Sequence, residues 1–136
     1  MTAIDPAFES LLAEPHVAVL ATNRRSGYPL LTPIWYLYED GRFYVTTNRR
    51  TAKAHNILRD PKVSLCIDSK QLPYKGVVVD GTAELRDDSD GAWTLRVFTR
   101  YLGPEGGREY HDRMMALPGR VLVIITPARL HTWDFS

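Results

Sequence analysis

Basic and hydroxyl side chains gather in residues 45–56, between an apolar stretch and the start of an expected helix. The segment reads Val-Thr-Thr-Asn-Arg-Arg-Thr-Ala-Lys-Ala-His-Asn. Cations at a helix N-terminus are unfavourable by ~0.3–1 kcal/mol each, whereas the free N–H groups and the helix dipole favour an anion there. This pattern indicates a cradle for a phosphate-bearing ligand, formed by Thr46, Thr47, Arg50, Thr51 and Lys53. The alternative is a solvated basic turn in which Thr51 serves only as the helix N-cap.

Other common chemistries find little support in the sequence. It contains no Gly-x-Ser-x-Gly nucleophile elbow, no Gly-x-Gly-x-x-Gly dinucleotide fingerprint and no Walker motif. The four histidines are isolated and lack the spacing of a metal-binding pair, so we expect no metal site. The formal net charge of +1 argues against a generally basic nucleic-acid binder. We therefore expect that nucleic acid is not a partner.

Length and composition are typical of one globular domain covering residues 1–136. Hydrophobic residues make up 44% of the sequence and charged residues 24%, and the single cysteine, Cys66, excludes a disulfide framework. No apolar run approaches the ~18 residues that a membrane span needs, and the first residues lack a signal-peptide pattern. We expect a cytoplasmic protein that does not contact a membrane.

Alternating apolar residues and turn signals predict about six strands with short helices between them. The expected strands are 16–22, 30–38, 42–47, 62–68, 75–86 and 120–126, the last continuing to 133. The expected helices begin at Pro6 and at Thr51 and cover 92–102 and 110–117, with a glycine-rich loop at 103–107. Pro33 interrupts the second strand, which indicates a sheet edge or bulge because proline cannot donate to the strand ladder. Short connections predict an antiparallel barrel rather than a parallel sheet.

Trp35 adds a flat apolar wall close to this interruption. It follows Thr32-Pro33-Ile34, where the proline leaves the strand backbone incompletely paired. Free N–H and C=O groups beside an aromatic ring suit the polar edge of a flat heterocycle.

Three segments of the chain resemble the pyridoxamine-phosphate-oxidase-like superfamily. They are Gly-Tyr-Pro-Leu-Leu-Thr-Pro-Ile-Trp at 27–35, Val-Thr-Thr at 45–47 and Arg-Thr-Ala-Lys-Ala-His-Asn-Ile-Leu-Arg-Asp-Pro-Lys-Val at 50–63. Residues 78–85, residues 120–124 and Trp133 extend the resemblance over most of the chain from about His16. The motifs are most similar to the flavin/deazaflavin oxidoreductase branch, of the F420-dependent B type. This resemblance implies a mainly β fold with short helices, the antiparallel split β-barrel of the FMN-binding type. It also implies a homodimer with cofactor sites at its interface.

The resemblance further implies contacts to a flavin or deazaflavin cofactor. These residues are Thr32, Pro33, Ile34, Trp35, Thr46, Thr47, Arg50, Thr51, Lys53 and Tyr74. Lys53 would contact the phosphate with support from Arg50 and Thr51, and the backbone of 32–35 would meet the polar edge of the ring. Related deazaflavin binders often carry a cation two residues before the matching lysine, where this chain has Thr51.

Three functions remain open at this point. The first is a reductase that uses coenzyme F420 to transfer a hydride to a small hydrophobic molecule with an electron-poor double bond. The second is an oxidoreductase that uses FMN in the same cleft. The third is a non-catalytic protein that holds a phosphorylated or tetrapyrrole-like ligand. Pyridoxamine phosphate oxidase activity itself is disfavoured, because the additional basic substrate contacts of those longer enzymes have no clear counterpart here. No catalytic residue or proton donor is indicated.

Overall fold

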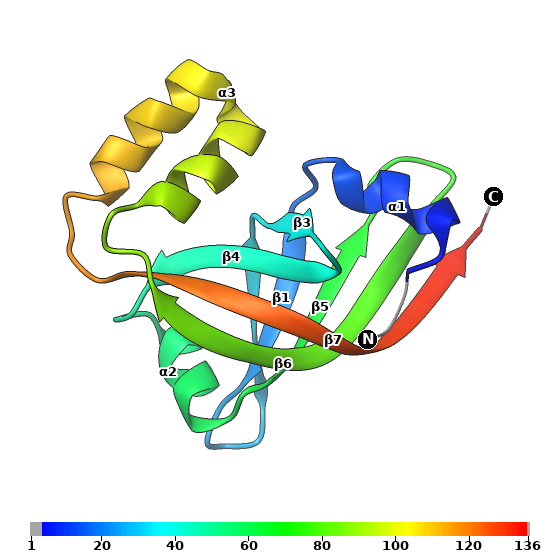
Figure 1. The fold of residues 1–136 in the computed structure, drawn as a ribbon. Coiled ribbons are helices and arrows are strands. Elements are labelled where there is room, and N and C mark those ends of the chain that lie inside the picture. Colours follow the sequence, from blue (N-terminus) through cyan, green and yellow to red (C-terminus); the bar gives the residue numbers. More distant parts are fainter. Residues whose placement is uncertain (1–3, 136) are drawn as a thin grey trace.

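The computed structural model describes residues 4–135, in which one curled antiparallel sheet is flanked by three helices (Figure 1). The strands are β1 (Ala18–Asn23), β2 (Pro29–Ile34), β3 (Leu37–Glu39), β4 (Arg42–Asn48), β5 (Lys62–Asp68), β6 (Lys75–Asp87) and β7 (Arg120–Asp134). The helices are α1 (Pro6–Ala13), α2 (Ala52–Arg59) and α3 (Ala92–Met114). The strand order is β2-β1-β5-β6-β7-β4-β3, and the sheet does not close. The predicted antiparallel split barrel is confirmed.

The two edges of this sheet are consecutive in the chain. Strand β2 ends at Ile34 and β3 begins at Leu37, so only Trp35 and Tyr36 separate the opposite edges. The sequence predicted one interrupted strand over 30–38, and the structure has two strands instead, which brings the total to seven within the described residues. Pro33 lies opposite Val19 on the edge strand β2, where a residue without an N–H can be accommodated.

The barrel interior is filled by apolar side chains. Alternate residues of β1, β4 and β5 are buried, as expected for strands with one face toward a core. Helix α1 closes one end, with Leu11 and Leu12 almost fully buried and Asp5 accepting a capping hydrogen bond from the Ala7 N–H at 2.9 Å. Because side chains fill the interior, a ligand must bind on the outside of the barrel wall.

Helix α3 departs most from the sequence expectation. The predicted loop at 103–107 is wrong, because these residues belong to the helix and only Gly103 leaves helical geometry, with φ of 81°. Pro104 then starts a second arm, where its missing N–H is tolerated. The two arms pack closely, since a Cβ on Gly107 would come within 2.6 Å of the Thr99 Cα. The glycines therefore serve a kink and a close contact, and the resulting helical hairpin projects from the barrel (Figure 1). No helix in residues 4–135 has the length and apolar character needed to cross a membrane.

Candidate functional site

A cleft of about 380 Å³ lies where α3 and the start of α2 approach the barrel wall. Its lining residues are Val17, Pro33, Ile34, Trp35, Thr46, Thr47, Lys53, Val97, Phe98, Tyr110, Met114 and Arg120. The structure thus brings together residues from three of the predicted segments, namely the end of β2, the end of β4 and the first turn of α2. Helix α3 and the first residue of β7 complete the cleft.

Two cations, Lys53 and Arg120, meet in this cleft. Arg120 Nη2 donates to Thr46 Oγ1 at 3.0 Å, and its Nε donates to Thr94 Oγ1 at 3.3 Å. Neither cation forms an ion pair with a carboxylate of the described residues. Burial lowers the pKa of the Lys53 ammonium, and the charge of Arg120 lowers it further. Two adjacent cations that form no ion pair favour the binding of an anion between them.

Burial lowers the pKa of the Arg120 guanidinium, and the negative charge of the buried Asp88 raises it by a smaller amount. The Asp88 oxygens accept hydrogen bonds from Trp93 N at 3.1 Å, Thr94 N at 3.0 Å and Thr94 Oγ1 at 2.6 Å. Asp88 therefore satisfies the free N–H groups at the start of α3. It anchors this helix next to the cleft rather than pairing with a cation.

Aromatic rings form the opposite wall of the cleft. Trp35 and Phe98 meet edge to face, with centroids 5.8 Å apart and an interplanar angle of 85°. Tyr110 lies 4.7 Å from Phe98 and 5.9 Å from Trp35. Flat rings of this kind can pack against a planar ligand with little loss of side-chain entropy.

Thr32 contributes a polar group with no partner. Its Oγ1 is buried and makes no hydrogen bond in the described structure. Thr32 itself does not line the cleft, but it lies on the same face of β2 as Ile34, which does. A buried hydroxyl without a partner is costly, by ~1–3 kcal/mol, unless a bound molecule satisfies it. In the cleft itself, the two cations and the aromatic wall fit a flat, anion-bearing cofactor.

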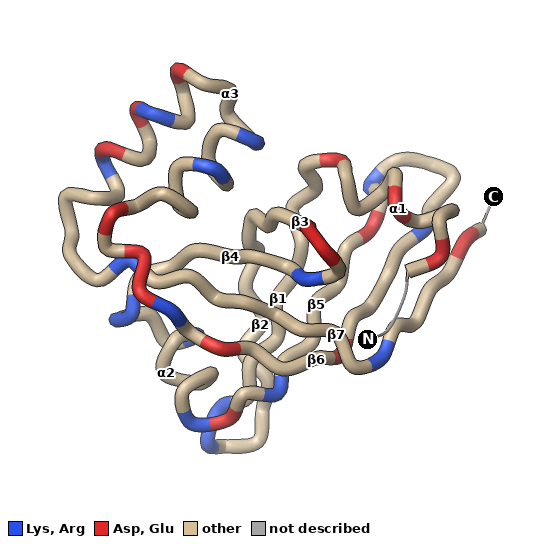
Figure 2. Tube along the Cα trace, in the orientation of Figure 1, with Lys and Arg blue, Asp and Glu red and all other residues tan. Residues whose placement is uncertain are grey.

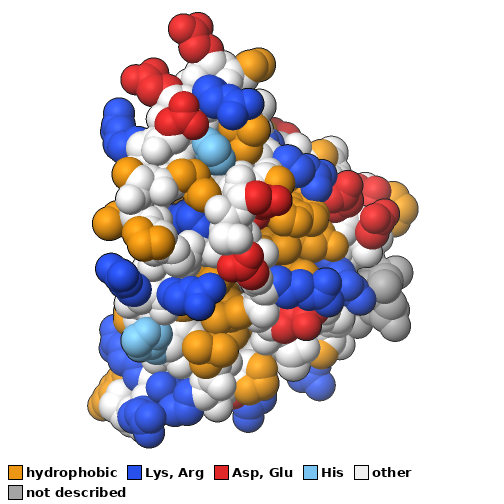
Figure 3. All heavy atoms as spheres, turned by 60° about the vertical axis from the view of Figure 1, so that its left-hand side comes forward, with side chains coloured by type: hydrophobic (Ala, Val, Ile, Leu, Met, Phe, Trp, Pro, Cys, Tyr) orange, Lys and Arg blue, Asp and Glu red, His pale blue; other side chains and the backbone are white. Residues whose placement is uncertain are grey.

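Thr51 and Arg50 do not line this cleft, although the Thr51 hydroxyl lies 3.3 Å from that of Thr47, which does. Thr51 Oγ1 accepts from Ala54 N at 3.4 Å and donates to Asn48 O at 2.8 Å, so Thr51 is the N-cap of α2, as the alternative interpretation predicted. Arg50 precedes this cap and lines a separate cleft on the other side of α2. Figure 2 shows that Lys and Arg are frequent around α2, whose first turn contains no acidic residue. Figure 3 shows basic side chains interleaved with hydrophobic ones on the face that carries α2 and α3.

Tyr74 does not reach the cleft of its own chain. It lies in the connection between β5 and β6 with 46% of its surface exposed. This connection runs beside α1, on the opposite side of the barrel from α3 (Figure 1).

Sequence reasoning missed the cleft residues that α3 and β7 provide. Arg120 lies opposite Asn48 through the pairing of β7 with β4, a register that the sequence does not reveal. Phe98 and Tyr110 meet only because Gly103 folds α3 back on itself. A signal was nevertheless present, since Arg120 directly precedes the apolar run of residues 121–125 in the sequence, and the structure shows it buried.

Comparison with known proteins identifies the family and the fold. Residues 4–134 match the family described as pyridoxamine 5'-phosphate oxidase. The structure is similar to an F420 reductase, with 25% identity, a TM-score of 0.79 and coverage of 94% of this chain and 98% of that chain. It is also similar to the conserved hypothetical protein Rv2991 from Mycobacterium tuberculosis, with 29% identity, a TM-score of 0.79 and coverage of 99% of this chain and 87% of that chain. HutZ, the heme storage protein from Vibrio cholerae, shares the fold at 21% identity, with a TM-score of 0.70 and coverage of 96% and 94%. The chain therefore belongs to the pyridoxamine 5'-phosphate oxidase family.

Proposed function

We propose that this protein is an F420-dependent oxidoreductase that acts on a small, hydrophobic, electron-poor substrate. The observation that carries the proposal is a cleft with two unpaired cations, Lys53 and Arg120, and an aromatic wall around Trp35. A deazaflavin combines an anionic phosphate with a flat ring, so it matches both the cations and the aromatic wall of the cleft. The similarity to an F420 reductase supports this choice of cofactor.

In this proposal each part of the cleft has a defined task. Lys53 and Arg120 bind the phosphate, and the backbone near Trp35 meets the ring. The cofactor supplies hydride transfer, while the protein supplies binding and orientation. Holding two reacting groups in a productive geometry can contribute ~7–11 kcal/mol, so no acid–base pair is required for the transfer itself. The phenol of Tyr110 is an O–H group of the lining that can deliver a proton to the product.

The apolar surface around the edge strand supports a homodimer as part of the proposal. Tyr28 is 72% exposed and Leu31 is 61% exposed, and a second copy would remove both from water. Because Tyr74 lies far from its own cleft, only a second copy could bring it to one. Sedimentation at micromolar concentration is expected to show a dimer, and a monomer would contradict this assembly.

An FMN-dependent oxidoreductase is the second candidate. The specific observation in its favour is that two cations face the cleft without a carboxylate between them. A phosphate monoester such as that of FMN carries close to two negative charges at pH 7, which suits two cations.

Titration of the ligand-free protein with F420 and with FMN, followed by fluorescence, tests the proposal. Tighter binding of F420, followed by oxidation of reduced F420 in the presence of electron-poor alkenes or quinones, is the expected result. Selective binding of FMN would replace the first candidate with the second. Tight binding without turnover of any acceptor would point to a storage or sensing protein, and binding of neither cofactor would overturn both candidates.

A further inference from the structure

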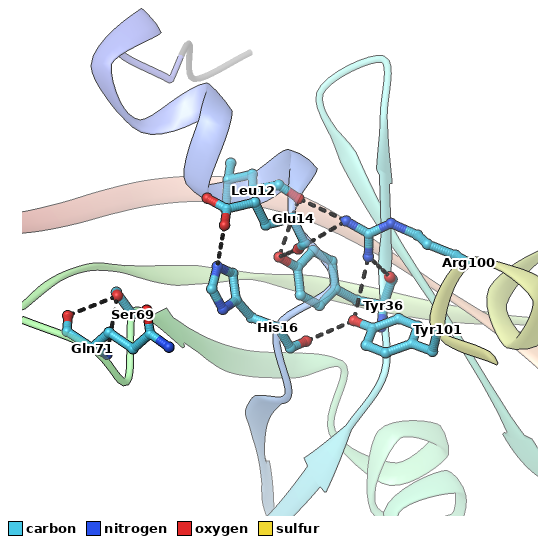
Figure 4. Close-up of polar contacts among 8 residues, drawn as sticks. All are labelled: Leu12, Glu14, His16, Tyr36, Ser69, Gln71, Arg100 and Tyr101. Atoms are coloured by element: carbon cyan, nitrogen blue, oxygen red, sulfur yellow. Dashed lines mark hydrogen bonds and ion pairs between the residues drawn. The ribbon is translucent and has the colours of Figure 1, made fainter. Parts of the chain in front are cut away.

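Side chains of α3 hold the two-residue link between the sheet edges (Figure 4). The Tyr36 N–H donates to Tyr101 Oη at 3.1 Å, and the Tyr36 carbonyl accepts from Arg100 Nη1. Tyr36 lies between the end of β2 and the start of β3. Helix α3 thus supplies the hydrogen-bond partners that a neighbouring strand would otherwise supply, at the point where the barrel is split.

The same two side chains connect the link to the segment before β1. Tyr101 Oη donates to the His16 carbonyl at 2.6 Å, and Arg100 Nη2 donates to the carbonyls of Leu12 and Glu14 at 3.0 Å each. The carbonyls of residues 12 and 14 also accept from the Tyr36 hydroxyl, at 3.1 and 3.2 Å. Two separated parts of the backbone, the link and residues 12–16, are therefore held by one set of side-chain donors. In Figure 4 the side chains of Tyr36, from the link, and of Arg100 and Tyr101, from α3, converge on this point.

Trp35 is fixed by this arrangement in two ways. Its ring stacks on Tyr101 with centroids 4.8 Å apart and an interplanar angle of 8°. Its peptide bond to Tyr36 is held because the Tyr36 N–H donates to the same Tyr101 hydroxyl. Trp35 lines the cleft, whereas Tyr101 lies behind it and does not.

We propose that Tyr101 is a positioning residue for the cofactor cleft. Its hydroxyl fixes the backbone at the barrel split, and its ring sets the plane of Trp35, against which the flat part of a ligand packs. The flavin-type ligand in this inference rests on the proposed function. The placement of Trp35 by Tyr101 does not, because it follows from contacts within the chain.

The variant Tyr101→Phe keeps the stacked ring and removes only the hydroxyl. Tyr44→Phe is the matched control, because Tyr44 stacks on Trp93 at 4.6 Å and 13° and lies outside the cleft lining. The first readout needs no cofactor: acrylamide quenching of tryptophan fluorescence, with Trp35→Phe used to identify the share of Trp35. We expect Tyr101→Phe to increase the quenching of Trp35, and Tyr44→Phe to leave it unchanged.

The second readout separates the ring from the phosphate. Tyr101→Phe removes a hydroxyl that bonds both Tyr36 N and the His16 carbonyl, so Trp35 should be less well placed. A loss of ring contact equivalent to one uncharged hydrogen bond, ~0.5–1.5 kcal/mol, corresponds to about a 2- to 12-fold rise in the dissociation constants of FMN and F420. Inorganic phosphate should compete with FMN and F420 for Lys53 and Arg120. The inhibition constant of phosphate in this competition should be the same for Tyr101→Phe as for the wild type. Equal losses for phosphate and for the whole cofactors would mean general loosening and would overturn the inference.

The two hypotheses fail in different ways. If the wild-type protein binds neither FMN nor F420, the proposed function fails, while the quenching of Trp35 still decides the role of Tyr101. Unchanged quenching in a folded Tyr101→Phe protein would overturn that role. Should this variant not fold, Arg100→Lys tests the same link, because it removes the planar fork that bridges Tyr36 to residues 12 and 14. It should likewise expose Trp35, and an unchanged signal would overturn the inference.

Discussion

Replacing Lys53 by methionine should move stability and binding in opposite directions. The ammonium of Lys53 is half-buried beside Arg120 without a carboxylate partner, so the ligand-free protein tolerates its charge at a cost. Methionine preserves most of the side-chain volume and removes this charge. We expect the free energy of unfolding of the ligand-free protein to rise by ~0.2–1 kcal/mol at neutral pH, the range of a partly screened charge pair.

The same change should weaken cofactor binding strongly. A hydrogen bond to a charged group contributes ~1.5–3 kcal/mol, so the dissociation constant should rise by about 10- to 150-fold. Calorimetric titration with F420 and with FMN measures this loss, and thermal unfolding without ligand measures the gain. Lys62→Met is the control, because this exposed lysine on β5 lies outside the cleft, and its loss changes the net charge equally.

The pH dependence provides a further check on the same residue. Because the folded pKa of Lys53 lies below its ordinary value of 10.5, the unfolded chain holds this proton more tightly. The contribution of Lys53 to unfolding free energy should therefore increase as pH rises from the lowered pKa to 10.5, and Lys53→Met should lack this increase. A variant that is less stable than wild type and binds cofactor normally would refute the reasoning, because Lys53 would then be a packing residue outside the site.

Further substitutions test the wall of the cleft and its supports. Tyr110→Phe should lower kcat by about 100-fold and leave the cofactor dissociation constant unchanged if its phenol delivers the proton; equal kcat in steady-state assays would exclude that role. Gly107→Ala should lower the urea-derived free energy of unfolding by ~1–3 kcal/mol, because its Cβ would overlap Thr99. Gly106→Ala should lower it less, since its Cβ meets only the Leu102 Cβ, at 3.2 Å, and alanine favours the helix. Burial raises the pKa of Tyr36 to about 12, so unfolding free energy should fall by up to ~2.7 kcal/mol between pH 10 and 12. Tyr36→Phe should reduce this alkaline decrease in pH-dependent denaturation, and the raised pKa values of Tyr101 and Tyr38, both caused mainly by burial, account for a remaining part.

Local signals were sufficient to predict several elements. Asp5 caps α1 as its sequence position indicates, and the turn at Asp40-Gly41, where both residues have positive φ, joins β3 to β4. Pro33 correctly marked an edge of the sheet. These features depend on the conformational preferences of a few neighbouring residues, which the sequence states directly.

Other features depend on distant parts of the chain and could not be predicted. Arg120 enters the cleft through the β4–β7 register, and glycine-rich composition at 103–107 does not distinguish a flexible loop from a close helix contact. The predicted cofactor contacts Thr32, Arg50, Thr51 and Tyr74 do not line the cleft that Lys53 shares with Trp35. For these four residues the contact with a cofactor remains a prediction, which binding experiments on the assembled protein must test.

The prolines of β2 also affect how copies of this protein can associate in concentrated solution. Alternate residues of a strand direct their N–H groups to the same side, so Pro29, Leu31 and Pro33 share one side of β2. Proline cannot donate to the ladder with β1, which makes this the free side of the edge. Of its three positions, only Leu31 can offer an N–H to a strand from another molecule. An exposed edge is a common starting point for aggregation, and here it lacks the donors that a continuous intermolecular sheet would need. Self-association of this chain is thereby directed to side-chain surfaces, and growth by strand addition at β2 is blocked.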